Sequence, residues 1–537
     1  MKSTLIKNGT VVTASAEYKA DILIEDGKIR EIGKNLAVEA ENIYDAKGKY
    51  VFPGGVDQHT HFNFKFGDAV VQGWDTTGAA VVGGTTTVID FANQEIGKSM
   101  TDSVRDYRAN KIDGITCCDY SLHTVIFESK DEIINEIEKL PEIGISTCKL
   151  FMAYKGHPQH CDDDTVLKAL QKSVGAGVTI MTHCENADMI DTLQKECLAK
   201  GMTEPYGHAV SRPPVVEVEA TERAISLAKL AKAPLYVAHV TAKGAMEAIR
   251  DAYADGYPIF GETCTHYLTL TTDNLAKPNF EGAKYVCSPA LRSQEHLDAL
   301  WGAVKKGYLN AISSDHCGFN WKDNKHQGKD NFVNIPNGAP GMGDRMNVIW
   351  TYGVETGKIS RQKYVELCCT NPAKINGIYP QKGVIAPGSD ADIVIFGAPF
   401  DSTTSYRPGT RFASKTIRSE SYGIETYSPY QDRDLEDIKV FDGGDIELPF
   451  GNPRKALDMI GEKTALILEN GKIPCMIGGE HLVTLGAFEK VYEKYLNVRV
   501  IHFDAHTDLR DEYLGENLSH ASVIRRIWDR YPLRRSL

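Results

Sequence analysis

Apolar and polar positions alternate over the first 50 residues, within three runs at 4–13, 20–33 and 42–52. Alternation with a period of two is typical of strands that bury one face. Asn-Gly, Asp-Gly and Lys-Gly pairs within these runs are typical of the turns between antiparallel strands. The pattern predicts a small β unit rather than a complete domain. It returns at 383–396, which predicts a further part of the same unit.

From about residue 52 to 375, short apolar runs alternate with longer stretches of helical period, such as 215–231 and 244–256. Repeated β-then-α units predict a parallel barrel of about eight strands, with its chemistry at the C-terminal ends of the strands. The predicted strands include 85–92, 120–127, 146–154, 178–184, 234–241, 259–268 and 309–317.

Length and composition narrow the class of protein. A chain of 537 residues is too long for one hydrophobic core, so two or three domains are expected. The formal net charge of -12 argues against a nucleic-acid surface, which needs a basic face. We expect neither a secretory signal nor a membrane span, because the sequence has no apolar segment of the required kind. Twelve cysteines without zinc-ribbon spacing predict reduced thiols and a cytoplasmic location.

Several polar residues lie in or directly after the predicted barrel strands. Two of them, His59 and His61, are two residues apart, which places both imidazoles on one face of a strand. A single strand-end histidine is more often structural, and a strand lysine usually lies at the surface. At one barrel mouth, however, the whole set predicts a metal site, because imidazole and carboxylate suit Zn²⁺. The set is His59, His61, Lys149, His183, His239 and Asp315.

The order HxH, Lys, His, His, Asp resembles the amidohydrolase superfamily. Within it, residues 1–396 resemble the dihydropyrimidinase/D-hydantoinase family, through FPGGVDQHTHF, GGTTTVIDFA, KLFMAYKG, THCEN, GETCTHYL, SPALR and IPNGAPG. The resemblance implies metal-dependent hydrolysis of the cyclic amide bond of dihydropyrimidines or hydantoins to N-carbamoyl amino acids. The expected partner is therefore a small cyclic ureide, with no nucleic acid and no membrane.

The resemblance also implies two Zn²⁺ ions and a metal-bridging hydroxide that attacks the ring carbonyl. Lys149 matches the lysine that the family carboxylates, and its carbamate would offer one oxygen to each ion. Asp315 would ligate a metal, accept the proton of the nucleophile and later protonate the leaving ring nitrogen. Of the remaining ligands, one ion would take His59 and His61, and the other His183 and His239.

Three further residues match the family's substrate contacts. Tyr154 in KLFMAYKG resembles the tyrosine that binds the attacked carbonyl and its developing charge. Ser288 in SPALR and Asn337 in IPNG resemble residues whose backbone groups pair with the imide of the ring. The chain departs from the family at Gly343, where an acidic residue is usual, and in the segment 64–74. No arginine follows the HxH, which disfavours a dihydroorotase.

Residues from about 397 onward resemble the agmatinase/arginase family of ureohydrolases, through GAPFDSTTSYRPGTRF, GGEH and FDAHTD. Alternate positions in FDAHTD place three side chains on one strand face. The resemblance implies a metal site for Mn²⁺, which we expect to be incomplete because a later Asp-x-Asp is not found. The candidate residues of this second site are His481, Asp504, His506 and Asp508.

The predicted fold is α/β: a TIM-type (β/α)8 barrel with a small, incomplete β-sandwich unit, followed by a partial three-layer α/β ureohydrolase-like domain. Residues 1–51 with about 376–396 form the sandwich unit, 52–375 the barrel and 397–537 a truncated ureohydrolase-like segment. We expect the front part of a hydantoinase-like gene to be joined at IVIFGAPFD to the front part of a ureohydrolase-like gene. The tail that helps the hydantoinase family form homotetramers would then be missing. Two other functions stay open: an agmatinase-type guanidine hydrolase in the C-terminal segment, and a non-catalytic dihydropyrimidinase-like protein.

Overall fold

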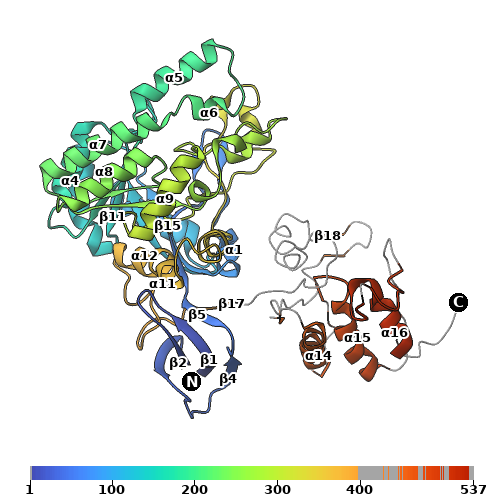
Figure 1. The fold of residues 1–537 in the computed structure, drawn as a ribbon. Coiled ribbons are helices and arrows are strands. Elements are labelled where there is room, and N and C mark those ends of the chain that lie inside the picture. Colours follow the sequence, from blue (N-terminus) through green and yellow to red (C-terminus); the bar gives the residue numbers. More distant parts are fainter. Residues whose placement is uncertain are drawn as a thin grey trace. The chain divides into compact units, whose positions relative to one another are not determined.

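The strand-length runs form a ring of parallel strands in the computed structural model (Figure 1). Strands from β6 to β15 pair in chain order. The segment 311–317 closes the ring, because β15 pairs with β14 while β16 pairs with β6. The predicted TIM-type barrel is therefore confirmed. Its strands are β6 (Gly55–His61), β9 (Thr85–Asn93), β10 (Asp119–Val125), β11 (Thr147–Phe151), β12 (Thr179–His183), β13 (Leu235–Val237), β14 (Ile259–Cys264), β15 (Ala311–Ser313) and β16 (His316–Cys317).

The chain divides into two units, Met1–Ile395 and Phe396–Leu537, and each is described by itself. The structure describes residues 3–396 and, in the second unit, residues 427–428, 433–434, 446, 448–449, 452–469, 474, 476–477, 479–495, 498, 500, 507–513 and 515–530.

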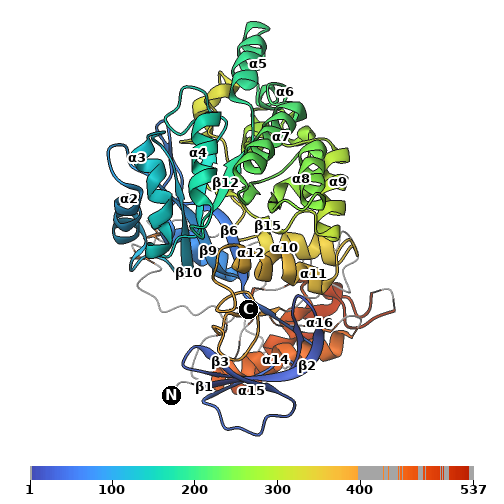
Figure 2. The ribbon, with the colours of Figure 1, turned by 90° about the vertical axis from the view of Figure 1, so that its left-hand side faces the viewer.

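Helices lie outside the ring of strands (Figure 2). Their starts follow local capping rules: Asp162 caps α4 by accepting the Thr165 amide, and α7 begins at Pro214, where a missing N–H costs nothing. The predicted helices at 215–231 and 244–256 correspond to α7 and α8. The main helices of this layer are α2 (Met100–Tyr107), α4 (Asp163–Ser173), α5 (Ala187–Ala199), α7 (Pro214–Ala231), α8 (Lys243–Ala254), α9 (Gln294–Lys306), α10 (Arg345–Ile349), α11 (Arg361–Val365) and α12 (Asn371–Ile375).

A second sheet combines segments that precede and follow the barrel. Its order is β17-β5-β1-β2-β3, with β4 paired to β1. One face buries Ile6, Val11, Ile22, Ile29 and Val51, as the alternation predicted. The strands are β1 (Ser3–Val12), β2 (Glu17–Glu25), β3 (Lys28–Gly33), β4 (Asn42–Asp45), β5 (Tyr50–Pro53) and β17 (Ile393–Phe396).

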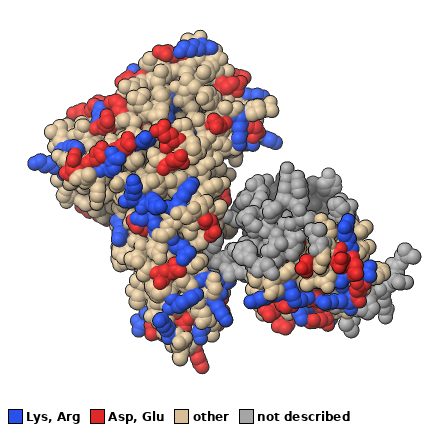
Figure 3. All heavy atoms as spheres, in the orientation of Figure 1, with Lys and Arg blue, Asp and Glu red and all other residues tan. Residues whose placement is uncertain are grey.

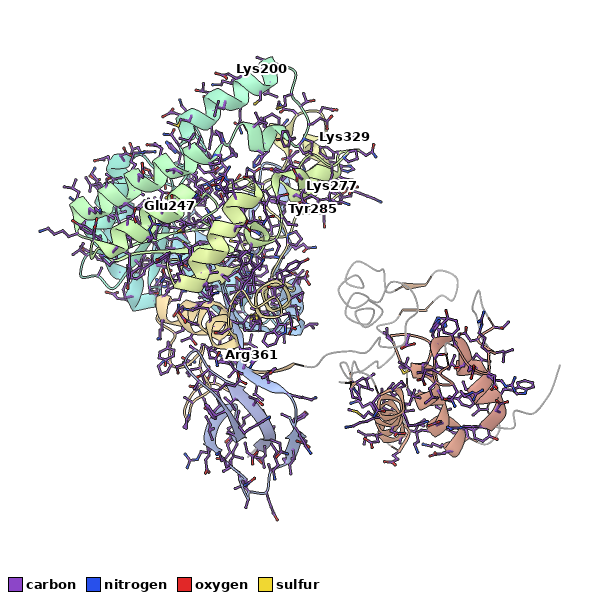
Figure 4. The ribbon with its side chains drawn as sticks, in the orientation of Figure 1. Lys200, Glu247, Lys277, Tyr285, Lys329 and Arg361 are labelled. Carbon is purple, nitrogen blue, oxygen red and sulfur yellow. The ribbon has the colours of Figure 1, made fainter. Side chains whose placement is uncertain are left out.

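Charged contacts attach this sheet to the barrel. Arg361 in α11, labelled in Figure 4, donates from Nε to Glu17 Oε2 at 2.9 Å. The buried Lys382 ammonium contacts Asp119 and Asp392, and Asp119 is the first residue of β10. The small sheet is thus fixed at the strand ends opposite to those that carry the predicted site.

In the second unit, the described residues include α14 (Pro453–Glu469), α15 (Val483–Lys494), α16 (Val523–Arg530) and the short pair β18 (Tyr427–Ser428) and β19 (Arg433–Asp434). The helices share a core of Leu457, Leu482, Leu485, Val523 and Ile527. The segment 397–426, part of residues 473–479 and most of residues 498–508 lie outside the described residues.

Acidic and basic side chains are interspersed over the visible face of the barrel unit, with most of the remaining surface uncharged (Figure 3). Within the described part of the chain, no helix combines the length and apolar character that crossing a membrane requires.

Candidate active site

The predicted site residues of the barrel come together at one rim. Because the strands are parallel, their C-terminal ends meet there. His59 and His61 end β6, Lys149 lies within β11 and His183 ends β12. His239 follows β13 by two residues, and Asp315 lies between β15 and β16.

Asp315 joins the two histidines of β6. Its Oδ1 atom lies 3.3 Å from His59 Nε2 and 3.2 Å from His61 Nε2. On the other side of the ring, His59 Nδ1 contacts Glu262 Oε1 at 2.5 Å. A carboxylate on one imidazole nitrogen fixes the ring so that the other nitrogen, Nε2, faces the site.

Lys149 is fully enclosed, with 1% of its surface exposed. Its Nζ atom lies 2.8 Å from His59 Nε2 and 4.3 Å from the centre of the Phe91 ring. Burial lowers the pKa of this amine to about 8, against an opposing effect of Asp315. Lys149 is therefore a buried lysine in contact with a histidine of the predicted site, rather than a surface residue.

His183 and His239 form the other side of the cluster, with ring centres 4.5 Å apart. His183 Nε2 donates to Glu185 Oε2 at 2.8 Å, and Arg212 donates to the same oxygen at 2.7 Å. His239 Nδ1 is buried and has no hydrogen-bond partner among the described residues. A buried polar atom without a partner is costly, so this nitrogen is suited to a ligand.

Three of the predicted residues have a positive φ although none is glycine: Tyr154 (62°), His239 (38°) and Asp315 (46°). Such backbone is uncommon for residues with a side chain and collects at functional sites, where the surrounding structure enforces it. Here it turns the chain directly after strands β11, β13 and β15.

Protonation states at the rim favour metal binding. Burial lowers the pKa of the imidazoles of His59, His61, His183 and His239, so these rings are neutral and keep a lone pair at neutral pH. Burial alone would raise the pKa of Asp315, but the adjacent histidines hold it well below its usual range. Neutral imidazoles beside an ionised carboxylate are a donor set that fits divalent metals.

The geometry agrees with this chemistry. Ligand atoms of His59, His61 and Asp315 all lie within 4.8 Å of one another. His239 adds a nitrogen that has no hydrogen-bond partner among the described residues, and Lys149 Nζ lies 2.8 Å from His59 Nε2. The residues present therefore fit a metal centre.

A pocket opens onto the cluster, and Tyr154, Ser288 and Asn337 all line it. Burial raises the pKa of Tyr154 to about 12, so its hydroxyl stays protonated and can donate a hydrogen bond. The remaining wall includes the apolar side chains Phe64, Phe91, Val125 and Phe151. The pocket thus combines polar groups at fixed positions with an apolar wall, as small-molecule sites do.

Two carboxylates in this site were missed by sequence reasoning. Glu262 orients His59, and Glu185 orients His183. Glu262 belongs to the motif GETC and lies within a predicted strand. Glu185 belongs to the motif THCEN and directly follows a predicted strand, as several of the histidines do. That position was the available signal.

Comparison with known proteins agrees with these observations. Residues 50–414 match the Amidohydrolase family. The chain belongs to the amidohydrolase family. D-hydantoinase from Ralstonia pickettii is 45% identical over 397 residues, which are 73% of this chain and 85% of that protein. D-hydantoinase from Streptomyces coelicolor is 45% identical over 438 residues, covering 80% and 90% respectively.

A solved structure supports the same family. The crystal structure of dihydropyrimidinase from Brevibacillus agri has a TM-score of 0.72 and 43% identity to this amidohydrolase, over 75% of this chain and 87% of that chain. Residues 391–536 match a second family, Arginase, and overlap the first match at 391–414. Both family predictions are therefore confirmed.

In the second unit, His481 Nδ1 lies 2.9 Å from Asp508 Oδ2. These two residues of the predicted second site are therefore neighbours. Asp504 and His506 lie outside the described residues.

Proposed function

We propose that the barrel of this amidohydrolase opens the ring of dihydropyrimidines or hydantoins by hydrolysing an amide bond, and releases N-carbamoyl amino acids. The observation that carries the proposal is the gathering of nine predicted residues around one rim pocket. The similarity to D-hydantoinases and a dihydropyrimidinase over most of their length supports the substrate class.

We propose Zn²⁺ as the metal, with His59 and His61 on one ion and His183 and His239 on the other. Asp315 completes the set, since its carboxylate reaches both histidines of β6. When bound, such ions would act as Lewis acids and would lower the pKa of the attacking water toward neutrality.

Carboxylation would let Lys149 serve both ions. A neutral amine attacks CO₂, an N–C bond forms and one proton leaves, so that the carbamate presents two oxygens. Burial supports this step, because it lowers the pKa of the Lys149 amine to about 8 and so enlarges its neutral fraction relative to an exposed lysine.

The other residues handle protons and position the ring. Asp315 accepts a proton from the attacking water and passes it to the ring nitrogen as the C–N bond breaks. Tyr154 donates from its hydroxyl to the oxygen of the attacked carbonyl, where negative charge develops. Backbone groups of Ser288 and Asn337 hold the imide edge of the ring.

Ring opening tests the proposal directly. The full chain, loaded with Zn²⁺, is incubated with dihydrouracil or hydantoin, and the N-carbamoyl product is separated by chromatography. We expect ring opening of at least one substrate. A chain that holds two ions and opens neither ring would overturn the proposed function.

A second candidate is hydrolysis of a guanidine such as agmatine by the second unit. The match of residues 391–536 to the Arginase family and the His481–Asp508 contact favour it. Urea release from agmatine by the full chain, with and without Mn²⁺, tests this candidate.

A further inference from the structure

Two backbone segments, 286–289 and 336–338, form one wall of the pocket through Ser288, Asn337 and Gly338. Buried side chains hold the first segment from behind. Tyr267 donates to the Pro289 carbonyl at 2.7 Å, and His208 Nε2 donates to the Cys287 carbonyl at 2.8 Å. These contacts leave the Ser288 groups to face the pocket.

Lys325 links the two segments. Its Nζ atom donates to the carbonyls of Val286 (2.9 Å), Pro336 (2.6 Å) and Gly338 (2.6 Å). An ammonium group carries three N–H donors, so all of them are used. The side chain lies in η7 (Lys325–Gly328) and is 3% exposed.

Burying the Lys325 ammonium costs free energy, and the arrangement is understandable if the position of the three carbonyls matters. In the described part of the chain, no ion pair includes Lys325. Its charge lies among three carbonyl dipoles and 5.7 Å from the centre of the Phe319 ring. Burying an ammonium without a carboxylate partner is unfavourable, and an uncharged side chain would be the cheaper filler. The charge therefore indicates a requirement for three simultaneous donors.

The second segment is also held tightly against the barrel. Gly338 has φ +145°, and a Cβ atom there would lie 2.5 Å from Cys317 Cβ in β16. The Cys317 amide donates to the Ala339 carbonyl at 2.9 Å. The distance between this wall and Asp315, two residues before Cys317, is thereby fixed on one side by β16 and on the other by Lys325.

We propose that Lys325 is a positioning residue that sets the spacing between the backbone groups of Ser288 and Asn337, and so the affinity for the imide edge of the ring. The inference rests on the proposed function. An imide presents one N–H donor between two carbonyl acceptors, so two backbone partners must stand at a fixed separation to bind it. Lys325 is not among the described residues that line the pocket, and acts through the wall.

The test compares Lys325→Met with the wild type in the full Zn²⁺-loaded chain. Methionine keeps the length but donates no hydrogen bond. One of the two imide carbonyls is not attacked and keeps its bonds through the reaction. Because its backbone contact is therefore similar in the bound substrate and in the transition state, we expect KM to rise about tenfold with a smaller change in kcat. Lys325→Arg retains the charge and the donors but arranges them in a planar fork, and should give a KM between those of Lys325→Met and the wild type.

Two lysine variants serve as controls. Lys382→Met removes another buried ammonium, remote from the pocket. Lys277→Met removes an exposed lysine whose Nζ donates to the Tyr285 hydroxyl at 2.8 Å, just before the first wall segment (Figure 4). Neither should change KM, so a rise confined to Lys325→Met separates the wall from general destabilisation.

Amide hydrogen exchange measures how firmly the wall is held, and it does not depend on turnover. The Gly338 amide, which donates to the Val286 carbonyl at 3.0 Å, should exchange faster in Lys325→Met and not in Lys382→Met. If Lys325→Met turns over the substrate with the kcat and KM of the wild type, the role of Lys325 is overturned. An unchanged exchange rate of the Gly338 amide in Lys325→Met overturns it as well. A wild-type chain that opens no ring overturns the proposed function instead, while the exchange rate still decides whether Lys325 holds the wall.

Discussion

The barrel rim and the second unit carry motifs of similar kind, but the environments of their histidines differ. The side chains of His59 and His183 are 0% and 2% exposed, and each contacts a buried carboxylate. The His481 side chain is 52% exposed beside Asp508. Burial keeps an imidazole neutral and fixed, whereas exposure leaves it hydrated. A ligand motif therefore becomes a defined site when other elements enclose it.

The largest effect is expected for Lys149→Ala. Without the amine no carbamate forms, so no side chain can join the two histidine pairs, and ring opening should fall to the uncatalysed rate. Zinc content and turnover are measured together, with thermal unfolding as the control for folding. Turnover that survives this substitution contradicts a bridging carbamate.

Asp315→Asn should follow. The amide can neither accept the proton of the nucleophile nor return it to the ring nitrogen, so kcat should fall about 10²- to 10⁴-fold. The kcat and KM for dihydrouracil are the measurement. A loss confined to KM would show that Asp315 serves binding rather than proton transfer.

Glu262→Gln tests whether the buried carboxylate beside His59 contributes to metal binding by orienting the imidazole. Glutamine keeps the shape but not the charge beside His59 Nδ1, and metal affinity should fall about 10- to 100-fold. Competition with a zinc-binding dye gives the affinity. Equal affinities in the two proteins would mean that His59 needs no carboxylate to orient it.

The pH dependence of activation tests the environment of Lys149. Only the neutral amine reacts with CO₂, and its pKa is lowered to about 8. Below that pH, each further unit should slow activation of the metal-free protein by bicarbonate and Zn²⁺ about tenfold, and above it the rate of the amine step should level off. The rates are corrected for the CO₂ present at each pH. A rate that keeps rising to about pH 10 would indicate an ordinary lysine.

The smallest effect is expected in the second unit. His481→Ala should leave the kcat and KM for dihydrouracil unchanged, because the barrel contains all the residues proposed for ring opening. His183→Ala, assayed beside it, should abolish turnover. A fall in ring opening for His481→Ala would make the two units functionally dependent.

The barrel and its rim residues could be predicted because they follow local rules. His59 and His61 share a strand face by their spacing, and strand ends in a parallel barrel must meet at one rim. The contacts of Glu262 and Lys325 depend on the paths of distant segments, which no local pattern specifies. The ligand roles, the domain boundaries and the cytoplasmic location stay predictions.

Zinc content per chain, measured by mass spectrometry alongside dihydrouracil turnover, decides whether the barrel rim holds a two-metal site. We expect about two ions in the wild type and in His481→Ala. Both zinc and turnover should be lost in the double variant His61→Ala/His183→Ala. Two ions retained by the double variant, or ring opening by a wild-type chain that holds less than about half an ion, would contradict a two-metal site at the barrel rim.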